Sequence, residues 1–218
     1  MRTAHKEAKD PPARNKRNPE ATRATILATA RAEFAAKGLE GARVDQIAAR
    51  AKLNKQLVYY YFGSKDDLYA AALEATYAEI RALERQLDLS ALPPREAMIK
   101  LIDFSLEYLE EHRDFIRMLS DENAHGARHV RDSDMAFRTN SPLLDLIEET
   151  LQRGVANGDF RAGVDPLELY VSIAGMTFFY FANNLTMSAI FGRNLGEKQA
   201  VTSYRNHIVE LTLRGLMP

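Results

Sequence analysis

The chain of 218 residues has no cysteine, few glycines and no long hydrophobic run. The lack of cysteine excludes a disulfide framework and a thiolate zinc site, and it fits a reducing compartment such as the cytoplasm. The 11 glycines are scattered, which disfavours a phosphate-binding glycine loop. The most apolar run, around residues 173–181, is too short to span a bilayer, and the N-terminus lacks an apolar signal segment. We expect a soluble cytoplasmic protein with no membrane partner.

Charge is distributed unevenly along the chain, although the net charge is only −1. Residues 1–65 hold 14 Lys and Arg against 6 Asp and Glu, whereas residues 66–218 hold 15 against 24. A basic segment beside an acidic remainder is typical of a DNA-binding protein with a separate second domain. A solvated basic tail is the alternative interpretation, because much of the positive excess lies in residues 2–17.

The first 20 residues are rich in proline and charge and contain almost no apolar side chain. Such a segment cannot bury enough surface to fold, so we interpret residues 1–20 as a flexible basic arm. Apolar residues then recur every three to four positions, and Gly38 follows them as a stop signal. This pattern predicts a first helix over residues 21–37.

Two short helices follow at the spacing of a helix-turn-helix unit. An apolar stripe about two turns long covers residues 44–51. After a turn at residues 52–53, Asn54 is a suitable N-cap for a second helix that reaches about Tyr61. In a unit of this kind the second helix enters the major groove, and the first crosses the DNA backbone.

The second of these helices carries side chains suited to DNA. Val58 and Phe62 lie four residues apart and are expected to face the core. Lys55 and Gln56 then lie at the exposed helix start, where they can reach base edges, and glutamine matches adenine. Tyrosine hydroxyls can donate to phosphates while their rings pack on sugars or thymine methyl groups. A buried β-strand over residues 59–62 is disfavoured, because helical segments flank this aromatic run.

A second phosphate contact is expected at Ser64-Lys65. A new helix starts there, so its first amide groups are free to donate and a lysine lies beside them.

A specific motif runs from Leu57 to Leu68, where three tyrosines and a phenylalanine are followed by Gly-Ser-Lys-Asp-Asp-Leu. The preceding positions that match the same pattern are Phe34, Gly38, Gly41, Ile47-Ala48 and Leu53-Asn54-Lys55. Together they resemble the N-terminal domain of tetracycline-repressor-type (TetR family) regulators, over the segment from Thr22 to Ala70. The DNA-contacting positions that this resemblance implies are Arg43, Val44, Gln46, Lys55, Gln56, Leu57, Tyr59, Tyr60, Tyr61 and Lys65.

Two residues depart from the family pattern. Arg43 stands where a Thr or Ser commonly caps the helix, so we expect no side-chain cap and a guanidinium available for phosphate. Lys52 stands where the turn commonly has glycine, and it is expected to adopt a left-handed backbone at a cost of about 1 kcal/mol.

Beyond Lys65 the pattern is helical throughout, and the resemblance extends to architecture only. The expected helices cover residues 65–87, 93–112, 115–121, 128–137, 142–156, 166–191 and 196–216. The predicted fold is all-α, with an N-terminal three-helix helix-turn-helix DNA-binding domain in residues 21–65. A C-terminal helical domain for ligand binding and dimerisation is expected in residues 66–218.

The last two helices carry more apolar surface than an outermost position requires. Pairing two copies into a four-helix interface would bury it, as in the family, and a homodimer also suits a palindromic operator. The residues expected at this interface are Ile173, Met176, Phe179, Tyr180, Asn183, Val201, Tyr204, Ile208 and Leu211. The alternative is that these stripes face the rest of their own domain.

A regulator of this family binds a small-molecule effector, whose identity the sequence does not reveal. Apolar and aromatic residues of the middle helices are candidates for the pocket, with a polar cluster as anchors. The candidate set is Phe104, Tyr108, Phe115, Met118, Leu119, Glu122, Asn123, His125, Arg128, His129, Phe178 and Phe181. Taken singly, each apolar member is more typical of the core than of a ligand contact, and a solvated, charge-paired surface is the slightly favoured interpretation of the polar cluster.

Two other classes of protein remain as alternatives. Glu122 and His125 form one Glu-x-x-His pair, but a di-metal helical-bundle enzyme needs two such pairs. A single regulatory zinc or nickel ion on Glu122, His125 and His129 is a less demanding alternative. An adaptor with a degenerate helix-turn-helix would carry acidic or apolar residues where Lys55 and Gln56 stand. We therefore predict a DNA-binding regulator, most simply a repressor released by its effector, with no catalytic residue, metal or cofactor.

Overall fold

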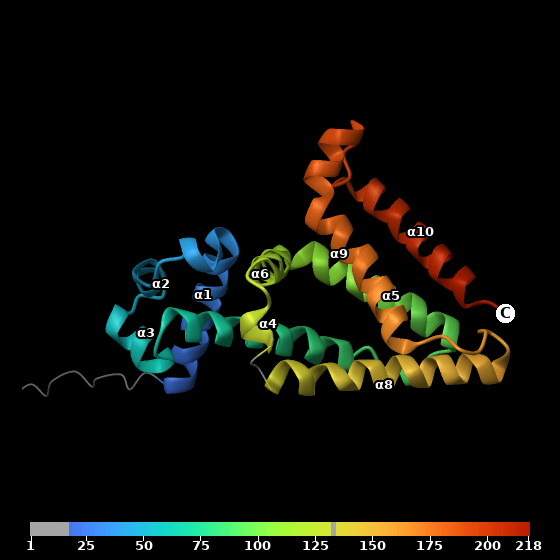
Figure 1. Ribbon diagram of the computed structural model, residues 1–218, viewed down its shortest axis with the longest axis horizontal. Coiled ribbons are helices and arrows are strands. Elements are labelled where there is room, and N and C mark those ends of the chain that lie inside the picture. The colour runs from blue at the N-terminus through green and yellow to red at the C-terminus, as the bar shows by residue number, and fades with distance from the viewer. Residues whose placement is uncertain (1–17, 132–133) are drawn as a thin grey trace, which may run out of the picture.

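The computed structural model describes residues 18–131 and 134–218, with the side chains of all of these except 134–141. Within this part of the chain there are helices and turns but no strand, so the predicted all-α fold is confirmed. Figure 1 shows a small lobe at one end of the molecule and a larger helical domain beside it. Most of the predicted arm lies outside the described residues.

The small lobe contains the helix-turn-helix unit. Its helices are α1 (Pro19–Gly41), α2 (Val44–Arg50) and α3 (Lys55–Phe62). Val58 and Phe62 of α3 are buried against the other two helices, as predicted.

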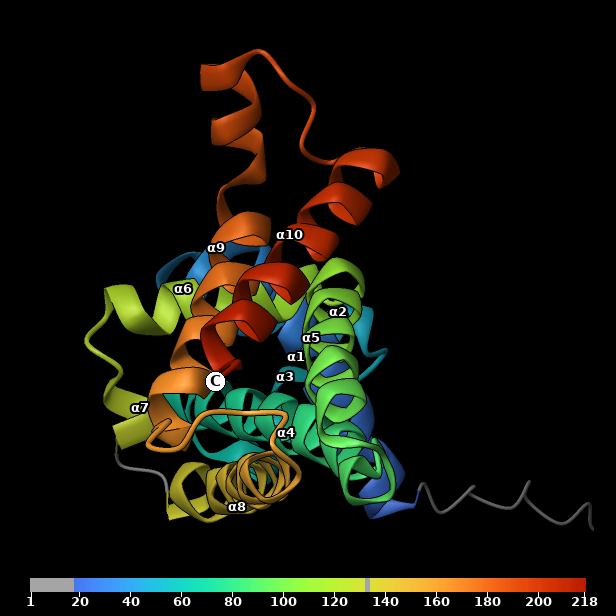
Figure 2. The same cartoon turned by 90° about the vertical axis from the view of Figure 1, so that its right-hand side faces the viewer.

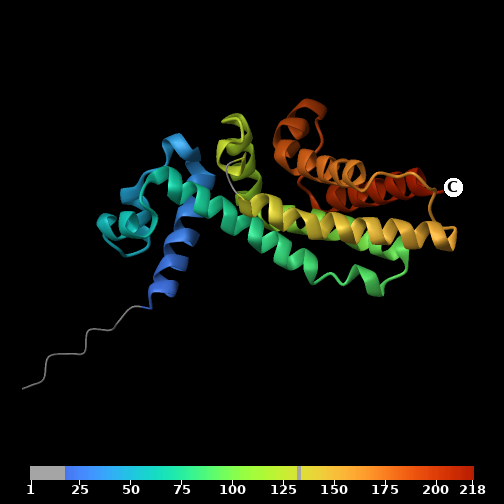
Figure 3. The same cartoon turned by 60° about the horizontal axis from the view of Figure 1, so that its bottom comes forward.

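Helix α4 (Lys65–Arg85) leads from the lobe into the larger domain, as Figure 3 shows from below. Its first half belongs to the core of the lobe, because Leu68 and Tyr69 are fully buried there. The Tyr69 ring meets Phe34 of α1 edge to face, with ring centroids 5.0 Å apart. The core of the lobe therefore extends past residue 65.

Side-chain caps precede α3 and α9, and the cap of α3 is the predicted residue Asn54. The Asn54 side chain accepts a hydrogen bond from the N–H of Leu57 at 2.7 Å. The Asp165 side chain accepts from the N–H groups of Leu167 at 2.8 Å and Glu168 at 2.9 Å. Both side chains satisfy amide donors that a helix start otherwise leaves free.

Three local predictions about turns are also confirmed. The backbone of Gly38 is not helical (φ 67°, ψ 176°), so the regular part of α1 ends where the glycine signal placed it. Lys52 has a left-handed backbone with φ 55°, which glycine would adopt more readily. Arg43 precedes α2 without making a side-chain cap.

The larger domain is a bundle in which α5 (Pro94–Glu111) is central. It packs against α8 (Asp134–Asn157), α9 (Pro166–Phe191) and α10 (Lys198–Leu216). The short helices η1 (Leu89–Ala91) and α7 (Arg128–Arg131) complete the domain with α6 (Arg113–Ala124), which lies against α1 of the lobe. Figure 2 shows the joined ends of α9 and α10 projecting beyond the other helices.

The predicted division of the middle segment into helices is wrong at one place. We expected helices over 128–137 and 142–156. The structure instead ends α7 at Arg131 and runs α8 from Asp134 straight through Pro142. Proline is commonest in the first turn of a helix, because a first-turn N–H has no partner there. In α8 it lies in the helix interior, where it removes one backbone hydrogen bond.

Across the described ranges, every helix is too short or too polar to cross a membrane.

Candidate nucleic-acid interface

The outward face of α3 presents the predicted DNA-reading side chains. Lys55, Gln56, Tyr59 and Tyr60 are exposed, and Tyr60 is the most exposed of the large apolar side chains on this helix, at 82%. Leu57 is only half-buried and lies beside them. The burial of α3's opposite face fixes this orientation, so the exposed row is held by the core of the lobe.

The tyrosines are positioned by contacts with their neighbours. Tyr61 is half-buried against the core of the lobe, and its ring meets that of Tyr60 edge to face at 5.5 Å. The Lys55 ammonium lies 5.7 Å from the centre of the Tyr59 ring. These contacts restrict the aromatic side chains before any DNA is bound.

Val44 does not belong with the predicted side-chain contacts. Its side chain is only 5% exposed and packs into the core of the lobe at the first position of α2. The resemblance marked the position, but the apolar stripe of α2 requires the side chain to point inward. Gln46, two residues later, is exposed as expected.

Arg43 is exposed but already has a carboxylate partner. Its guanidinium pairs with Asp45, with the Nη2 to Oδ2 distance at 2.9 Å. This hydrogen bond lowers the pKa of the Asp45 carboxyl. A phosphate would have to compete with Asp45 for Arg43, so the expectation of a free guanidinium is wrong.

The start of α4, where we predicted a phosphate contact, makes several hydrogen bonds within the chain. Ser64 and Asp67 form a reciprocal capping box, in which the Ser64 hydroxyl accepts from the Asp67 N–H at 3.0 Å. Asp66 and Asp67 place two carboxylates in this first turn, which repel an anion. The Lys65 ammonium donates to the carbonyl oxygens of Glu40 and Ala42, both at 3.2 Å, so it joins α4 to the end of α1.

A buried carboxylate that the sequence did not single out joins α1 to α2. Glu33 is fully buried, and its carboxylate accepts from Lys37 at 2.7 Å. Arg50 of α2 pairs with the other oxygen at 2.9 Å. The hydrogen bond from Lys37 is the main reason that the pKa of Glu33 is lowered, and Arg50 adds to it.

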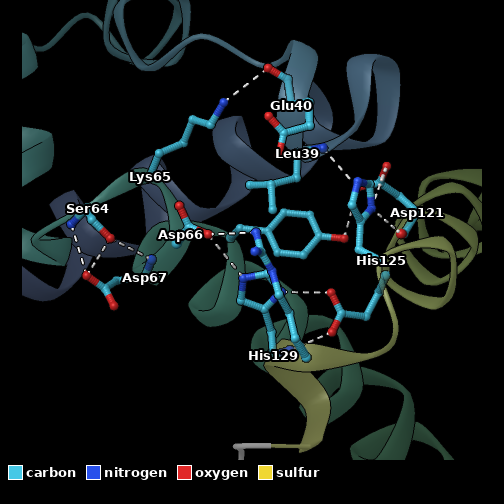
Figure 4. A network of polar contacts seen from close by, with 12 residues as sticks. Leu39, Glu40, Ser64, Lys65, Asp66, Asp67, Asp121, His125 and His129 are labelled. Carbon is cyan, nitrogen blue, oxygen red and sulfur yellow. Dashed lines mark hydrogen bonds and ion pairs between the residues drawn. The ribbon is translucent and has the colours of Figure 1, made fainter.

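Much of the predicted polar anchor set lies at the junction of the two domains rather than in a pocket. Figure 4 shows this network between α6, α7, α4 and the end of α1. Asp121 of α6 accepts from the Leu39 N–H at 2.8 Å and from the Tyr69 hydroxyl at 3.2 Å. Burial and this carboxylate raise the pKa of Tyr69, so its hydroxyl remains a donor.

A second set of contacts joins α7 to the first turn of α4. Arg128 pairs with Asp66 at 2.9 Å, and the Nε2 atom of His129 lies 3.6 Å from the same carboxylate. The other ring nitrogen of His129 lies 2.8 Å from buried Glu122, which also accepts from the His129 N–H at 2.7 Å. Four predicted effector contacts, Glu122, Arg128, His129 and buried Met118 in the lobe's core, therefore join the domains.

The remaining polar candidates do not form the predicted helical face. Helix α6 ends at Ala124, and Gly126 and Ala127 have positive φ, so His125 does not share a face with Glu122 and His129. The His125 ring lies against the Asp121 carbonyl oxygen at 2.7 Å, and Asn123 is exposed. Among the residues whose side chains are described, no group of three His, Asp or Glu side chains is placed to hold a metal ion.

The apolar effector candidates lie in or beside the core of the larger domain. Tyr108, Phe115 and Phe181 are buried, whereas Phe104, Leu119 and Phe178 are partly exposed. A cavity of about 530 Å³ lies elsewhere, between the loop before α9 and the end of α10. Which of these residues contact an effector stays a prediction.

Several of the residues predicted at the dimer interface are buried within their own domain. Ile173, Tyr180 and Ile208 are buried in their own domain, and Met176, Asn183, Val201 and Tyr204 are half-buried. Tyr180 stacks on Tyr204 at 4.1 Å, and their hydroxyls donate to the carbonyl oxygens of Leu195 and Met176. These contacts join α9 to α10 within one chain. Of the predicted set only Phe179 and Leu211 are exposed.

The exposed large apolar side chains of α9 extend beyond the predicted set and lie on more than one side of the helix. They are Leu167, Val171, Phe179, Leu185, Ile190 and Phe191. Because α9 is apolar on nearly every side, the sequence could not indicate which side the protein covers.

Comparison with known proteins gives two family matches. Residues 26–72 match the model described as bacterial regulatory proteins of the tetR family, and residues 94–212 match the tetracyclin repressor-like C-terminal domain. The HTH-type transcriptional repressor NicS of Pseudomonas putida is 34% identical over 195 residues, 89% of this chain and 92% of the relative. The HTH-type transcriptional repressor SCO4008 of Streptomyces coelicolor is 42% identical over 105 residues, 47% of this chain and 50% of the relative.

Solved structures share the fold at low sequence identity. A regulator from Saccharomonospora viridis in complex with choline has a TM-score of 0.71 at 20% identity, covering 91% of this chain and 99% of that one. The regulator FadR from Bacillus subtilis in complex with stearoyl-CoA has a TM-score of 0.65 at 16% identity, covering 88% and 98%.

Proposed function

Because the chain belongs to the TetR family of bacterial transcriptional regulators, we propose that it is a homodimeric repressor that a small-molecule effector releases from a palindromic operator. Operator DNA lies in the cytoplasm of a bacterium, and we place the protein there. The larger domain would bind the effector and the second copy.

The observation that carries the proposal is the exposed row on α3. Lys55 and Gln56 lie at the start of the helix, and Tyr59 and Tyr60 follow one turn later on its exposed side. A helix that buries one face in a small lobe and presents Lys, Gln and Tyr on the other is suited to the major groove. Tyr60, at 82% exposure, has no structural role that would explain a large ring there.

Dimerisation is supported by the exposed apolar side chains of α9. Leu185 is 83% exposed, and it lies with Phe179 and Ile190 on a helix that projects beyond the bundle (Figure 2). Exposed apolar side chains in this number are typical of an interface. Two copies paired through α9 would present two α3 helices, one to each half-site of a palindrome, with centres about 34–36 Å apart.

Effector control is supported by the junction of the domains. Asp121 contacts the end of α1, and Arg128 and His129 contact the first turn of α4. An effector that moves α6 or α7 would therefore move the lobe, and the spacing of the two α3 helices would no longer match the half-sites.

The test is selection of bound sequences from a random DNA library with the purified full chain. We expect one palindromic site, a complex of two chains per duplex, and an affinity that falls steeply with salt because phosphate contacts release counterions. No enrichment, or enrichment with a flat salt dependence, would contradict the proposal.

A further inference from the structure

The larger domain contains a buried ion pair between two residues of the same helix. Arg81 of α4 is only 5% exposed and Glu84 only 7%, and the guanidinium donates to a Glu84 carboxylate oxygen at 2.6 Å. Both residues lie on the same helix three positions apart, so their pairing joins no two elements. A buried ion pair costs several kcal/mol of desolvation per ion, which its own attraction rarely exceeds.

The guanidinium has one further partner and one unused donor. Its Nη2 atom donates to the Tyr170 hydroxyl of α9 at 3.0 Å. Its Nε atom is buried without any hydrogen-bond partner. A guanidinium presents its donors as a planar fork that matches a carboxylate with two parallel hydrogen bonds. Arg81 is therefore an incompletely satisfied carboxylate receptor inside the domain.

Aromatic side chains surround this receptor. Tyr77 lies one turn before Arg81 on α4, and its ring meets Phe115 edge to face at 5.9 Å. The Arg81 guanidinium lies 5.7 Å from the centre of the Tyr170 ring. Tyr77 and Tyr170 are both half-buried, although both pack against the core, so solvent reaches the rim of the cluster.

We propose that Arg81 anchors the carboxylate of the effector, and that Glu84 occupies this anchor as an internal stand-in until the effector displaces it. This inference rests on the proposed function, because it names the chemical class of the effector. Glu84 lies in the last turn of α4, next to exposed Arg85, and can turn outward when it is displaced.

The environment of Glu84 favours its replacement at Arg81 by the carboxylate of an effector. Burial raises the pKa of its carboxyl despite the attraction of Arg81. A carboxylate that is costly to keep ionised in the interior gives way more easily to one supplied from outside.

The ligand class follows from these contacts. One carboxylate is needed for the guanidinium, and an apolar body suits the aromatic rings of Tyr77 and Tyr170. Monocarboxylic acids with an aromatic or aliphatic body meet both requirements, whereas amines carry the wrong charge for the guanidinium.

The test measures direct binding of benzoate and hexanoate to the full chain by calorimetry, with the uncharged isostere benzamide as the matched probe. We expect the carboxylates to bind and benzamide to bind at least about tenfold more weakly, since charged hydrogen bonds to guanidinium are lost. Arg81→Met should abolish the difference between benzoate and benzamide. Arg85→Met, which removes an exposed guanidinium from the same helix, should preserve it.

Glu84→Gln distinguishes this inference from a purely structural role. With the internal competitor removed, benzoate should bind about tenfold more tightly than to the wild-type chain. A pair that only supports the fold would give weaker or unchanged binding in this variant. If Arg81→Met does not fold, the double variant Arg81→Met with Glu84→Met removes both charges and serves in its place, because apolar replacement of a buried pair is often tolerated.

The outcomes separate the two proposals. A chain that selects an operator but in which Glu84→Gln binds neither carboxylate overturns this inference alone. A chain that binds benzoate through Arg81 but enriches no DNA overturns the proposed function alone. Equal binding of benzoate and benzamide also overturns the inference.

Discussion

At the scale of single residues, the clearest division is between side chains held by the protein and side chains left for DNA. Tyr60 belongs to the second group. Its ring meets Tyr61 and is 82% exposed, so its removal should cost the fold little. Glu33 belongs to the first group, since it is fully buried between two cations.

Replacing Tyr60 with alanine should weaken operator binding by about tenfold, because one contact to phosphate, sugar or base is worth about 1–3 kcal/mol. The melting temperature should not change. Tyr60→Phe keeps the ring and loses the hydroxyl, so an intermediate affinity would assign part of the effect to a phosphate hydrogen bond. Unchanged affinity of the folded alanine variant would remove Tyr60 from the interface.

Glu33 should make stability depend on pH. Because its pKa is lowered from the usual 4.5, the ionised carboxylate stabilises the fold above about that pH, and the contribution is lost as pH falls through the lowered pKa. We expect Glu33→Gln to lower the free energy of unfolding by about 1–3 kcal/mol at pH 7.

The difference between wild type and Glu33→Gln should shrink toward pH 3, as measured by urea unfolding. Glu40→Gln changes an exposed carboxylate on the same helix and should have little effect at either pH. A difference that stays constant with pH would show that the lost stability does not come from the charge of Glu33.

At the scale of secondary structure, the sequence predicted the N-caps that begin helices. It did not predict which side of a helix is buried and which is exposed. Asn54 and Asp165 act through amide groups two or three residues away, so their role is visible in a short segment. The exposed side of α9 depends on what the rest of the chain covers, and Tyr180 looked like an interface residue although it stacks on Tyr204.

Contacts distant along the chain escaped prediction for the same reason. Arg128 and Asp66 are 62 positions apart, and neither residue carries a signal that names the other. The helix-turn-helix was predictable because its spacing and its residue types lie within one continuous segment. The effector anchors were not, because a charged cluster on a helix looks the same whether it faces a ligand or another domain.

Helix α8 and the turn after it should depend on Gly154. A β-carbon at this position would lie 2.0 Å from the ring of buried Phe160, which folds back over the helix. Gly154→Ala should therefore lower the free energy of unfolding by about 1–3 kcal/mol through overpacking. Gly215→Ala is the matched control, because a β-carbon there meets nothing within 4 Å. Chemical denaturation of the two variants checks this, and equal stabilities would mean that Phe160 moves aside freely.

At the scale of the whole molecule, exposed side chains suited to a partner lie on α3 in the lobe and on α9 in the larger domain. They lie on different domains (Figure 1), so a substitution on α9 can be tested by its effect on operator binding through α3. In a dimeric regulator, loss of pairing leaves one lobe per molecule to hold the operator.

In the proposed dimer, Phe179→Glu should separate the two copies, because it places a charge among the exposed apolar side chains of α9. Operator affinity should fall by about a hundredfold with the loss of the second half-site contact. Light scattering coupled to size exclusion gives the mass, and a binding titration gives the affinity. Val155→Glu changes an exposed apolar residue of α8 and should alter neither. A Phe179→Glu chain that remains dimeric would place the interface elsewhere.

The junction in Figure 4 has a consequence for engineering by recombination. Its two sides lie in the two separately matched segments, with Asp66 and Tyr69 in residues 26–72 and Asp121, Arg128 and His129 in residues 94–212. A chimera that grafts this lobe onto the body of another regulator would keep the groove-reading helix but sever every one of these bonds. The lobe and the larger domain can therefore be exchanged between regulators only when the residues on both sides of this junction are exchanged with them.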